Sequence, residues 1–291
     1  MRPNAGFFPT LLAFLYGLTF LHAQEKPDAF AALEAKNGGK LGLAAIDLQD
    51  RRTLTHRADE RFPLCSTFKL PLAAAVAARI DAGKETWDHP VSYGKKQLVP
   101  YSPVTGGKEN LRNGKMSLAK LCEAAITLSD NTAANLLLDT IDGPEGFNRF
   151  LVSLGDTTTF LERREPALNS STVGDPRDTT TPAAMLATME KLLVGPTLQP
   201  ASREKLIGWL VATRTGDKRI RAGMPAGWKV GDKTGTCGNG ATNDIAIVWP
   251  PGREPILLAI YYYAPQTPSN QREAVIAEAA RQVREHFVPQ P

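Results

Sequence analysis

The sequence contains no block of lysine and arginine and only four histidines. Its formal charge is only +4 over 291 residues, and lysine and arginine are spread thinly along the chain. We therefore expect no nucleic-acid partner. The four histidines are scattered and none has the spacing of metal ligands, which argues against a metallo-hydrolase and against a Ser-His-Asp hydrolase. We expect no metal and no other cofactor.

Long hydrophobic runs are also missing, except at the N-terminus. There Arg2 precedes the apolar run Phe7 to Phe20, and Leu21-His22-Ala23 supplies a small-residue cleavage site, which is the order found in a secretory signal. The run is short for a membrane anchor, and no later segment approaches a spanning length. We predict a signal peptide at residues 1–23, a mature chain from Gln24, export to a bacterial periplasm and no membrane attachment after cleavage.

The chain has only three cysteines, which are Cys65, Cys122 and Cys237. An odd number in an oxidising compartment is most simply explained by one disulfide and one buried thiol. Cys122 lies in an apolar segment with a helical pattern, where a buried and unreactive thiol fits.

Strand patterns occupy both ends of the mature chain, and helix patterns occupy its middle. The strands are expected at residues 41–49, 53–57, 243–249 and 255–263, and the terminal helices at 28–36 and 270–287. This order predicts an α+β fold, in which an antiparallel sheet is flanked by the N- and C-terminal helices and an all-helical domain is inserted. We expect an α/β domain at 24–61 and 212–291, and a helical domain at 62–211 that includes a loop at 161–178.

The pair Ser66 and Lys69 precedes an uncharged, alanine-rich run that predicts a buried helix. Three residues of spacing place the hydroxyl and the amine on one face of its first turn, where a partly desolvated lysine can take the serine proton. Pro71 indicates that the helix begins slightly later than the apolar pattern suggests. Alone the pattern is weak, because Ser-x-x-Lys occurs three more times, from Ser92, Ser117 and Ser202.

Two further tripeptides follow in a fixed order, Ser129-Asp130-Asn131 after an apolar helix and Lys233-Thr234-Gly235 before strand-like sequence. Either one alone is explained by a capping turn or a strand edge. Together with Ser66 and Lys69, they form the motif set of class A β-lactamases and penicillin-binding proteins. The chain resembles that superfamily over essentially all of its mature length.

The segment Glu165 to Asn169 selects within the superfamily. It places a carboxylate and an amide four residues apart, a spacing that can hold a water between a general base and its hydrogen-bond partner. It resembles the water-activating loop of class A β-lactamases, which implies an Arg163–Asp178 ion pair across the loop and a cis Glu165–Pro166 bond. Glu162 and Arg164 are rivals for these roles, but only Glu165 has the asparagine in register.

The resemblance implies a reaction through an acyl-enzyme on Ser66. The proton of Ser66 would pass to Lys69 or, through a water, to Glu165, and both alternatives stay open. The N–H groups of Ser66 and Thr236 would form the oxyanion hole. Ser129, helped by Lys233, would give a proton to the departing ring nitrogen.

The resemblance also implies how the substrate is held and released. Its carboxylate would meet Lys233, Thr234, Thr236 and Arg219, where Arg219 takes the place of an arginine that many relatives carry on the strand after Lys-Thr-Gly. Asn131 would bind the side-chain amide of the substrate, Tyr101 would form a wall of the cleft, and Glu165 with Asn169 would position the hydrolytic water. The partners expected are small-molecule β-lactams, and we expect a monomer.

If Ser66 and Thr236 share an oxyanion hole, their neighbours Cys65 and Cys237 must approach each other. A disulfide there matches the class A carbapenemases and implies a broad spectrum that reaches carbapenems.

Two rival functions share part of this pattern. A penicillin-binding D-Ala-D-Ala peptidase would use the same Ser66, Lys69, Ser129 and Lys233, but Glu165 and Asn169 argue against it. A β-lactam sensor that acylates and stalls would give a burst without turnover, and it would carry a membrane segment that this chain lacks beyond its signal.

Overall fold

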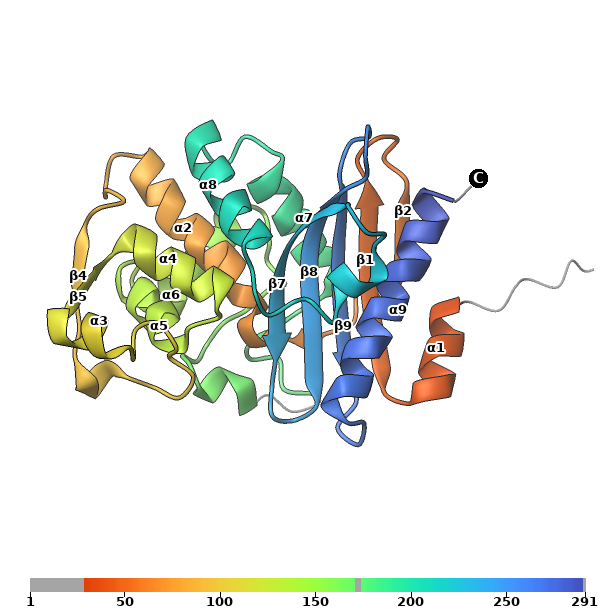
Figure 1. Cartoon of the computed structure of the whole chain (residues 1–291), viewed down its shortest axis with the longest axis horizontal. Coiled ribbons are helices and arrows are strands. Elements are labelled where there is room, and N and C mark those ends of the chain that lie inside the picture. The colour runs from red at the N-terminus through yellow and green to blue at the C-terminus, as the bar shows by residue number, and fades with distance from the viewer. Residues whose placement is uncertain (1–28, 171–173, 290–291) are drawn as a thin grey trace, which may run out of the picture.

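The computed structural model describes residues 29–170 and 174–289, so the expected signal peptide at 1–23 lies outside the described residues. Its centre is a five-stranded antiparallel sheet with the strand order β2-β1-β9-β8-β7 (Figure 1). The strands are β1 (Lys40–Asp47), β2 (Thr53–His56), β7 (Lys229–Thr236), β8 (Ala241–Trp249) and β9 (Ile256–Tyr263). Strands from both ends of the chain are therefore neighbours in one sheet, because β1 pairs with β9 along its whole length.

Each face of the sheet is buried under helices, which explains why β1 and β9 are apolar on both faces over most of their length. Leu41, Leu43 and Ala45 of β1 pack against the terminal helices α1 (Ala29–Asn37) and α9 (Ser269–Phe287). The alternate residues, such as Ala44 and Ile46, belong to the core shared with the helical part of the chain. The predicted α+β fold is confirmed.

The helical part surrounds α2 (Lys69–Asp81), in which every residue from Lys69 to Ala77 is buried. The other helices of this part are α3 (Lys108–Asn113), α4 (Leu118–Thr127), α5 (Asn131–Asp139), α6 (Gly143–Ser153), α7 (Pro182–Leu193) and α8 (Pro200–Val211). Small alanine side chains let neighbouring helices approach α2 closely. At its start, the Phe68 ring meets the Phe147 ring of α6 edge to face at 6.1 Å.

Ser66 lies in a 3₁₀ turn, η1 (Cys65–Phe68), and α2 begins only at Lys69. The late start indicated by Pro71 is confirmed, since Pro71 is the third residue of α2, where a missing N–H costs no helical hydrogen bond.

The sequence pattern was wrong about Lys233-Thr234-Gly235, which it placed before the strands. The tripeptide lies inside β7, where Lys233 pairs with Ile245 and Gly235 with Asn243 of β8. The strand escapes the pattern because glycines and charged residues interrupt its apolar positions. Gly235 favours this close approach, because a Cβ would make tight contacts, 3.0 Å from the Leu64 carbonyl oxygen and 3.1 Å from the Cys65 Cβ.

Several short elements are too brief to give a periodic signal. They are two-stranded ribbons of β3 (Phe62–Pro63) with β6 (Thr179–Thr180) and of β4 (Pro90–Ser92) with β5 (Lys115–Ser117), and the 3₁₀ turns η2 (Lys95–Gln97), η3 (Ala167–Ser170) and η4 (Ile220–Gly223). No helix among residues 29–170 and 174–289 has the length and apolar character needed to cross a membrane.

A disulfide joins Cys65 of η1 to Cys237, the residue after β7, with the two Cα atoms 5.6 Å apart. The expected pairing is confirmed, and it fastens the helical part to the sheet. The remaining cysteine, Cys122, is buried in α4, and burial raises the pKa of its thiol above the usual range.

We predict that loss of the disulfide lowers stability without preventing folding. The bonded cysteines are 172 residues apart, and crosslinks of that reach typically contribute about 2–4 kcal/mol. A Cys65→Ala/Cys237→Ala variant should therefore melt roughly 5–15 °C below wild type in a thermal scan followed by circular dichroism. Cys122→Ala is the control, because its melting should still respond to reductant; a wild-type protein whose bridge is demonstrably reduced yet melts unchanged would contradict the prediction.

Candidate active site

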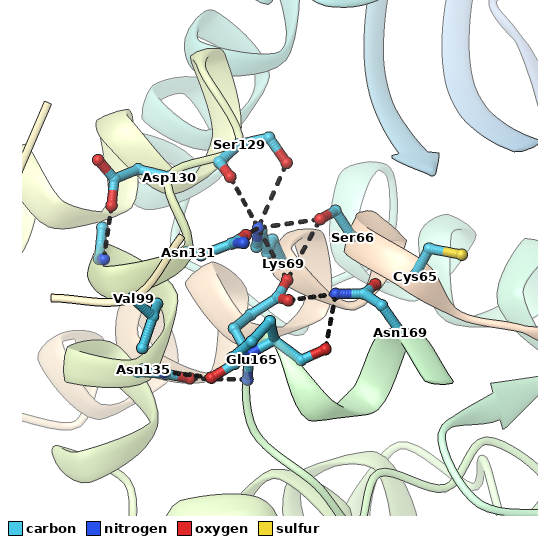
Figure 2. Close-up of polar contacts among 12 residues, drawn as sticks. Cys65, Ser66, Lys69, Val99, Ser129, Asp130, Asn131, Asn135, Glu165 and Asn169 are labelled. Carbon is cyan, nitrogen blue, oxygen red and sulfur yellow. Dashed lines mark hydrogen bonds and ion pairs between the residues drawn. The ribbon is translucent and has the colours of Figure 1, made fainter. Parts of the chain in front are cut away.

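Ser66 and Lys69 meet as their spacing predicts. The Lys69 Nζ donates to the Ser66 Oγ at 2.9 Å, and the Ser66 hydroxyl faces the Glu165 Oε1 at 3.3 Å (Figure 2). The serine oxygen thus lies between an amine and a carboxylate, each of which is within reach of its proton.

Lys69 is fully buried, and its Nζ is surrounded by oxygen atoms. It donates to the Ser129 carbonyl at 2.8 Å and to the Asn131 Oδ1 at 2.6 Å, and it lies 3.0 Å from the Glu165 Oε1. Burial lowers the pKa of Lys69, although the carboxylates of Glu165 and Asp130 oppose that shift. A lowered pKa makes the neutral amine, which can accept a proton, more accessible.

Ser129 lies in the turn between α4 and α5 with a φ of 56°, in the left-handed region that a side chain disfavours. This backbone directs its hydroxyl toward two amines, since the Lys69 Nζ lies 3.3 Å and the Lys233 Nζ 3.0 Å from the Ser129 Oγ. Burial and the charge of Lys69 hold the pKa of Lys233 well below its usual value.

Asp130 fixes this turn from behind. Its buried carboxylate caps α5 through the Ala133 N–H and accepts from the N–H groups of Val104 and Thr105. It therefore anchors the segment that carries Tyr101, a residue that is 60% exposed and lines the cleft described below.

Glu165 is held by its backbone as well as by its side chain. The Glu165–Pro166 bond is cis, as expected, and the Asn169 Nδ2 donates to the Glu165 Oε2 at 2.5 Å. Asn135 was missed by the sequence reasoning: its side chain accepts from the Glu165 N–H at 3.0 Å and donates to the Glu165 carbonyl at 2.9 Å. The available signal was its spacing, since Asn135 lies one turn after Asn131 on the same face of α5 (Figure 2).

The loop is closed by Asp178, which is fully buried. Its carboxylate accepts from the Arg163 Nε and from the N–H groups of Glu162 and Arg163. Arg164 instead pairs with Asp139 on α5. The rival carboxylate, Glu162, lies near Arg177 at the surface, so the structure brings Glu165 to Ser66 and leaves Glu162 outside.

Arg219 is buried beside β7. Its guanidinium donates to the carbonyl oxygens of Gly235 and Asn243 and, at 2.7 Å, to the Thr236 Oγ1, and it pairs with Glu273 of α9 at 3.3 Å. These bonds hold the Arg219 guanidinium beside Thr236, and both residues line the cavity described below.

The side chains enclose one cavity of about 510 Å³, a size suited to a small molecule. It is lined by Ser66, Tyr101, Ser129, Asn131, Asn169, Arg214, Thr215, Arg219, Thr234 and Thr236. The disulfide joins the residues next to Ser66 and Thr236, both of which line this cavity. Two residues that the motifs did not indicate, Arg214 and Thr215, also reach it.

Asn131 is already engaged. Its Oδ1 accepts from Lys69, and its Nδ2 donates to the Pro100 carbonyl at 2.9 Å. An amide side chain keeps a second lone pair and a second hydrogen, so Asn131 can still accept one hydrogen bond and donate one.

Comparison with known proteins adds to this geometry. The model of the Beta-lactamase enzyme family matches residues 26–287. The carbapenem-hydrolyzing β-lactamase KPC of Klebsiella oxytoca is 47% identical over 280 residues, which cover 96% of this chain and 91% of that protein. β-Lactamase CTX-M-8 of Citrobacter amalonaticus is 42% identical over 278 residues, covering 95% and 94% of the two chains. The solved structure of the ancestral (GNCA) class A β-lactamase aligns with a TM-score of 0.86 and 58% identity, covering 88% of this chain and 98% of that one.

The contacts of Lys69 predict how its titration depends on Glu165. The Glu165 carboxylate favours the ammonium form, so a Glu165→Gln variant should lower the pKa of Lys69 further. NMR titration of ¹³C-labelled lysine Cε signals measures this directly. Glu162→Gln removes an exposed carboxylate from the same loop and should leave the pKa of Lys69 unchanged. If both variants changed the pKa of Lys69 equally, the specific coupling of Lys69 to Glu165 would be contradicted.

Proposed function

The chain belongs to the class A β-lactamases, and from this membership we propose that it hydrolyses the β-lactam amide through an acyl-enzyme on Ser66 that a Glu165-activated water releases. The observation that carries the proposal is the position of the Glu165 carboxylate, which lies 3.3 Å from the Ser66 Oγ and is held by Asn169.

In the acylation step, the Ser66 Oγ attacks the lactam carbonyl carbon while its proton leaves. Lys69 and Glu165 both lie close enough to receive that proton. The lowered pKa of Lys69 supports the neutral amine as the acceptor, with the Glu165 carboxylate stabilising the ammonium that forms.

The developing negative charge needs donors at the carbonyl oxygen. The N–H groups of Ser66 and Thr236 are suited to this role because the disulfide between their neighbours holds the two segments together. A single oxyanion-hole donor is worth about 3–4 kcal/mol in the transition state.

Breaking the lactam C–N bond requires a proton on the departing nitrogen. Ser129 can donate its hydroxyl proton and recover one from Lys233, whose Nζ lies 3.0 Å from the Ser129 Oγ. Burial lowers the pKa of Lys233, which makes its ammonium a stronger proton donor toward the Ser129 Oγ.

The polar groups that line the cavity indicate how the substrate is bound. We assign the substrate carboxylate to Lys233, Thr234, Thr236 and Arg219, and the substrate side-chain amide to the remaining hydrogen-bonding capacity of Asn131. Tyr101 is exposed at the mouth and offers an apolar wall.

Deacylation separates this proposal from the peptidase alternative. A water between Glu165 and Asn169 would lose a proton to the carboxylate as its oxygen attacks the Ser66 ester. Asn169 and the Asn135 bonds to the Glu165 backbone keep that carboxylate in place, so the site supports turnover as well as acylation.

We predict that Glu165→Gln is acylated but releases product at least about 10³-fold more slowly, because its amide cannot act as the base. Intact-mass spectrometry after mixing with a chromogenic cephalosporin should detect a stable adduct, which a Ser66→Ala variant should lack.

The matched control is Glu162→Gln, which changes a neighbouring exposed carboxylate and should turn over like wild type. Wild-type turnover by Glu165→Gln would remove Glu165 from the mechanism.

We also propose that the spectrum of this enzyme includes carbapenems. Two observations support this: the disulfide beside the oxyanion hole, and the 47% identity to a relative named as carbapenem-hydrolyzing. The Cys237 Sγ lies 3.4 Å from the Asn169 Oδ1, so the disulfide contacts the residue that would orient the hydrolytic water.

Purified protein should hydrolyse many equivalents of a carbapenem, followed as loss of the substrate's ultraviolet absorbance. Cys237→Ala should lower carbapenem turnover by at least about tenfold, since misplacement of a catalytic group costs rate steeply. Cys122→Ala, which alters a distant buried thiol, is the control. A burst of one equivalent without further hydrolysis would contradict carbapenemase activity and leave the cephalosporin reaction standing.

We propose export to the bacterial periplasm as the setting for this activity. The support is the sequence of residues 1–23, and the intact mass of protein recovered from a periplasmic fraction would show whether the mature chain begins at Gln24.

A further inference from the structure

Arg214 is an exposed residue in the segment between α8 and η4, and it lines the same cavity as Ser66 and Ser129. The backbone around it is fixed, because the Arg214 N–H donates to the Thr127 carbonyl and the Thr213 Oγ1 donates to the Asp232 carbonyl at 2.7 Å. A defined backbone thus presents a flexible cation at the wall of the cleft.

The guanidinium of Arg214 differs from the other arginines of its segment. Arg219 pairs with Glu273 at 3.3 Å, and Arg221 pairs with Asp232 at 2.6 Å. Within residues 29–170 and 174–289, the Arg214 side chain forms no hydrogen bond or ion pair. Its charge is therefore available to a ligand.

The neighbouring charges do not cancel that of Arg214. On its other side lies a depression that Lys120 and Glu123 share, and the other exposed charged residues of its own loop are Asp217 and Lys218. Each pair sums to zero, so Arg214 accounts for the net positive charge at this part of the wall.

Arg214 adjoins the place where we assign the substrate carboxylate. The next residue, Thr215, lies with its Oγ1 2.6 Å from the Thr234 Oγ1. Arg219 reaches the same strand from the Thr236 end, at 2.7 Å. At the Thr236 end of the carboxylate subsite lies Arg219, whose charge is balanced by Glu273. Next to the Thr234 end lies Arg214, which has no such partner.

The chemistry of cephalosporins indicates what Arg214 meets. Their six-membered ring carries the carboxylate on one carbon and a variable substituent, here called the arm, on the carbon beside it. With the carboxylate at Thr234, the adjacent ring carbon would place the arm near the residues beside Thr234, which include Thr215.

We propose that Arg214 is a specificity-determining residue, which binds an anionic group on the arm and disfavours a cationic one. This inference rests on the proposed assignment of the carboxylate subsite. Such a contact is solvent-exposed, so it should discriminate modestly and weaken with salt.

The test uses three cephalosporins with one acylamino side chain and with anionic, neutral or pyridinium arms. In wild type, kcat/KM should be highest for the anionic arm. Arg214→Gln should lower the ratio of anionic to cationic kcat/KM by about three- to tenfold, mainly through KM. Arg214→Lys should retain most of the ratio, and Arg214→Glu should invert it.

Lys218→Gln is the matched control, because it removes the same charge from the same loop at a residue outside the cavity lining. It should leave the ratio within about twofold of wild type, and raising the salt to about 0.5 M should reduce the wild-type ratio.

Equal effects of Arg214→Gln and Lys218→Gln would overturn the inference while leaving the proposed function intact. The neutral-arm cephalosporin reports on the proposed function separately. If wild type failed to hydrolyse it, or Ser66→Ala hydrolysed it equally, both proposals would be wrong.

Discussion

Two lysine amines lie fully buried within hydrogen-bond distance of one hydroxyl, the Ser129 Oγ, and the arrangement of the site depends on their burial. A buried ammonium is costly unless oxygen atoms replace its water. For Lys69 these oxygens come from Ser129 and Asn131 at the start of α5 and from Glu165 in the 163–178 loop. The need to solvate one amine thus brings two separate segments, which carry Ser129 and Glu165, to the start of α2.

The sheet is held against the site by close packing and by bonds between β7, β8, β9 and the segment around Ser66. Gly235 lets β7 lie against the main chain at Leu64 and Cys65, and the Asn243 Nδ2 donates to the Pro63 carbonyl from the neighbouring strand. The Thr67 Oγ1 contacts the Tyr261 hydroxyl at 3.2 Å, and the Cys65–Cys237 disulfide completes the junction. The active site therefore lies where the helical part meets the sheet edge, and its geometry depends on contacts that neither part makes alone.

The difference between local motifs and tertiary contacts explains which features the sequence predicted well. Ser66, Lys69, Ser129 and Lys233 occur in motifs whose spacing is local, and the apolar periods at both chain ends predicted the sheet and its flanking helices. Asn135 and the β7 assignment were missed because their roles come from tertiary contacts: one holds the Glu165 backbone, and the other is a strand whose glycine and buried charges break the apolar alternation. Arg214 was missed for a third reason, since an unpaired surface arginine has no sequence pattern that separates it from a solvated one.

The charge distribution of the cleft makes that last residue important. Lys69 is balanced by Glu165 and Arg219 by Glu273, and Lys233 is fully buried. These groups are suited to stabilising charge once the substrate is in place, but each is shielded by a partner or by burial. An exposed, unpaired guanidinium acts at longer range, because its field is not cancelled locally. The same structure therefore separates the cations that serve the proposed chemistry from the one that can distinguish substrates by charge as they enter.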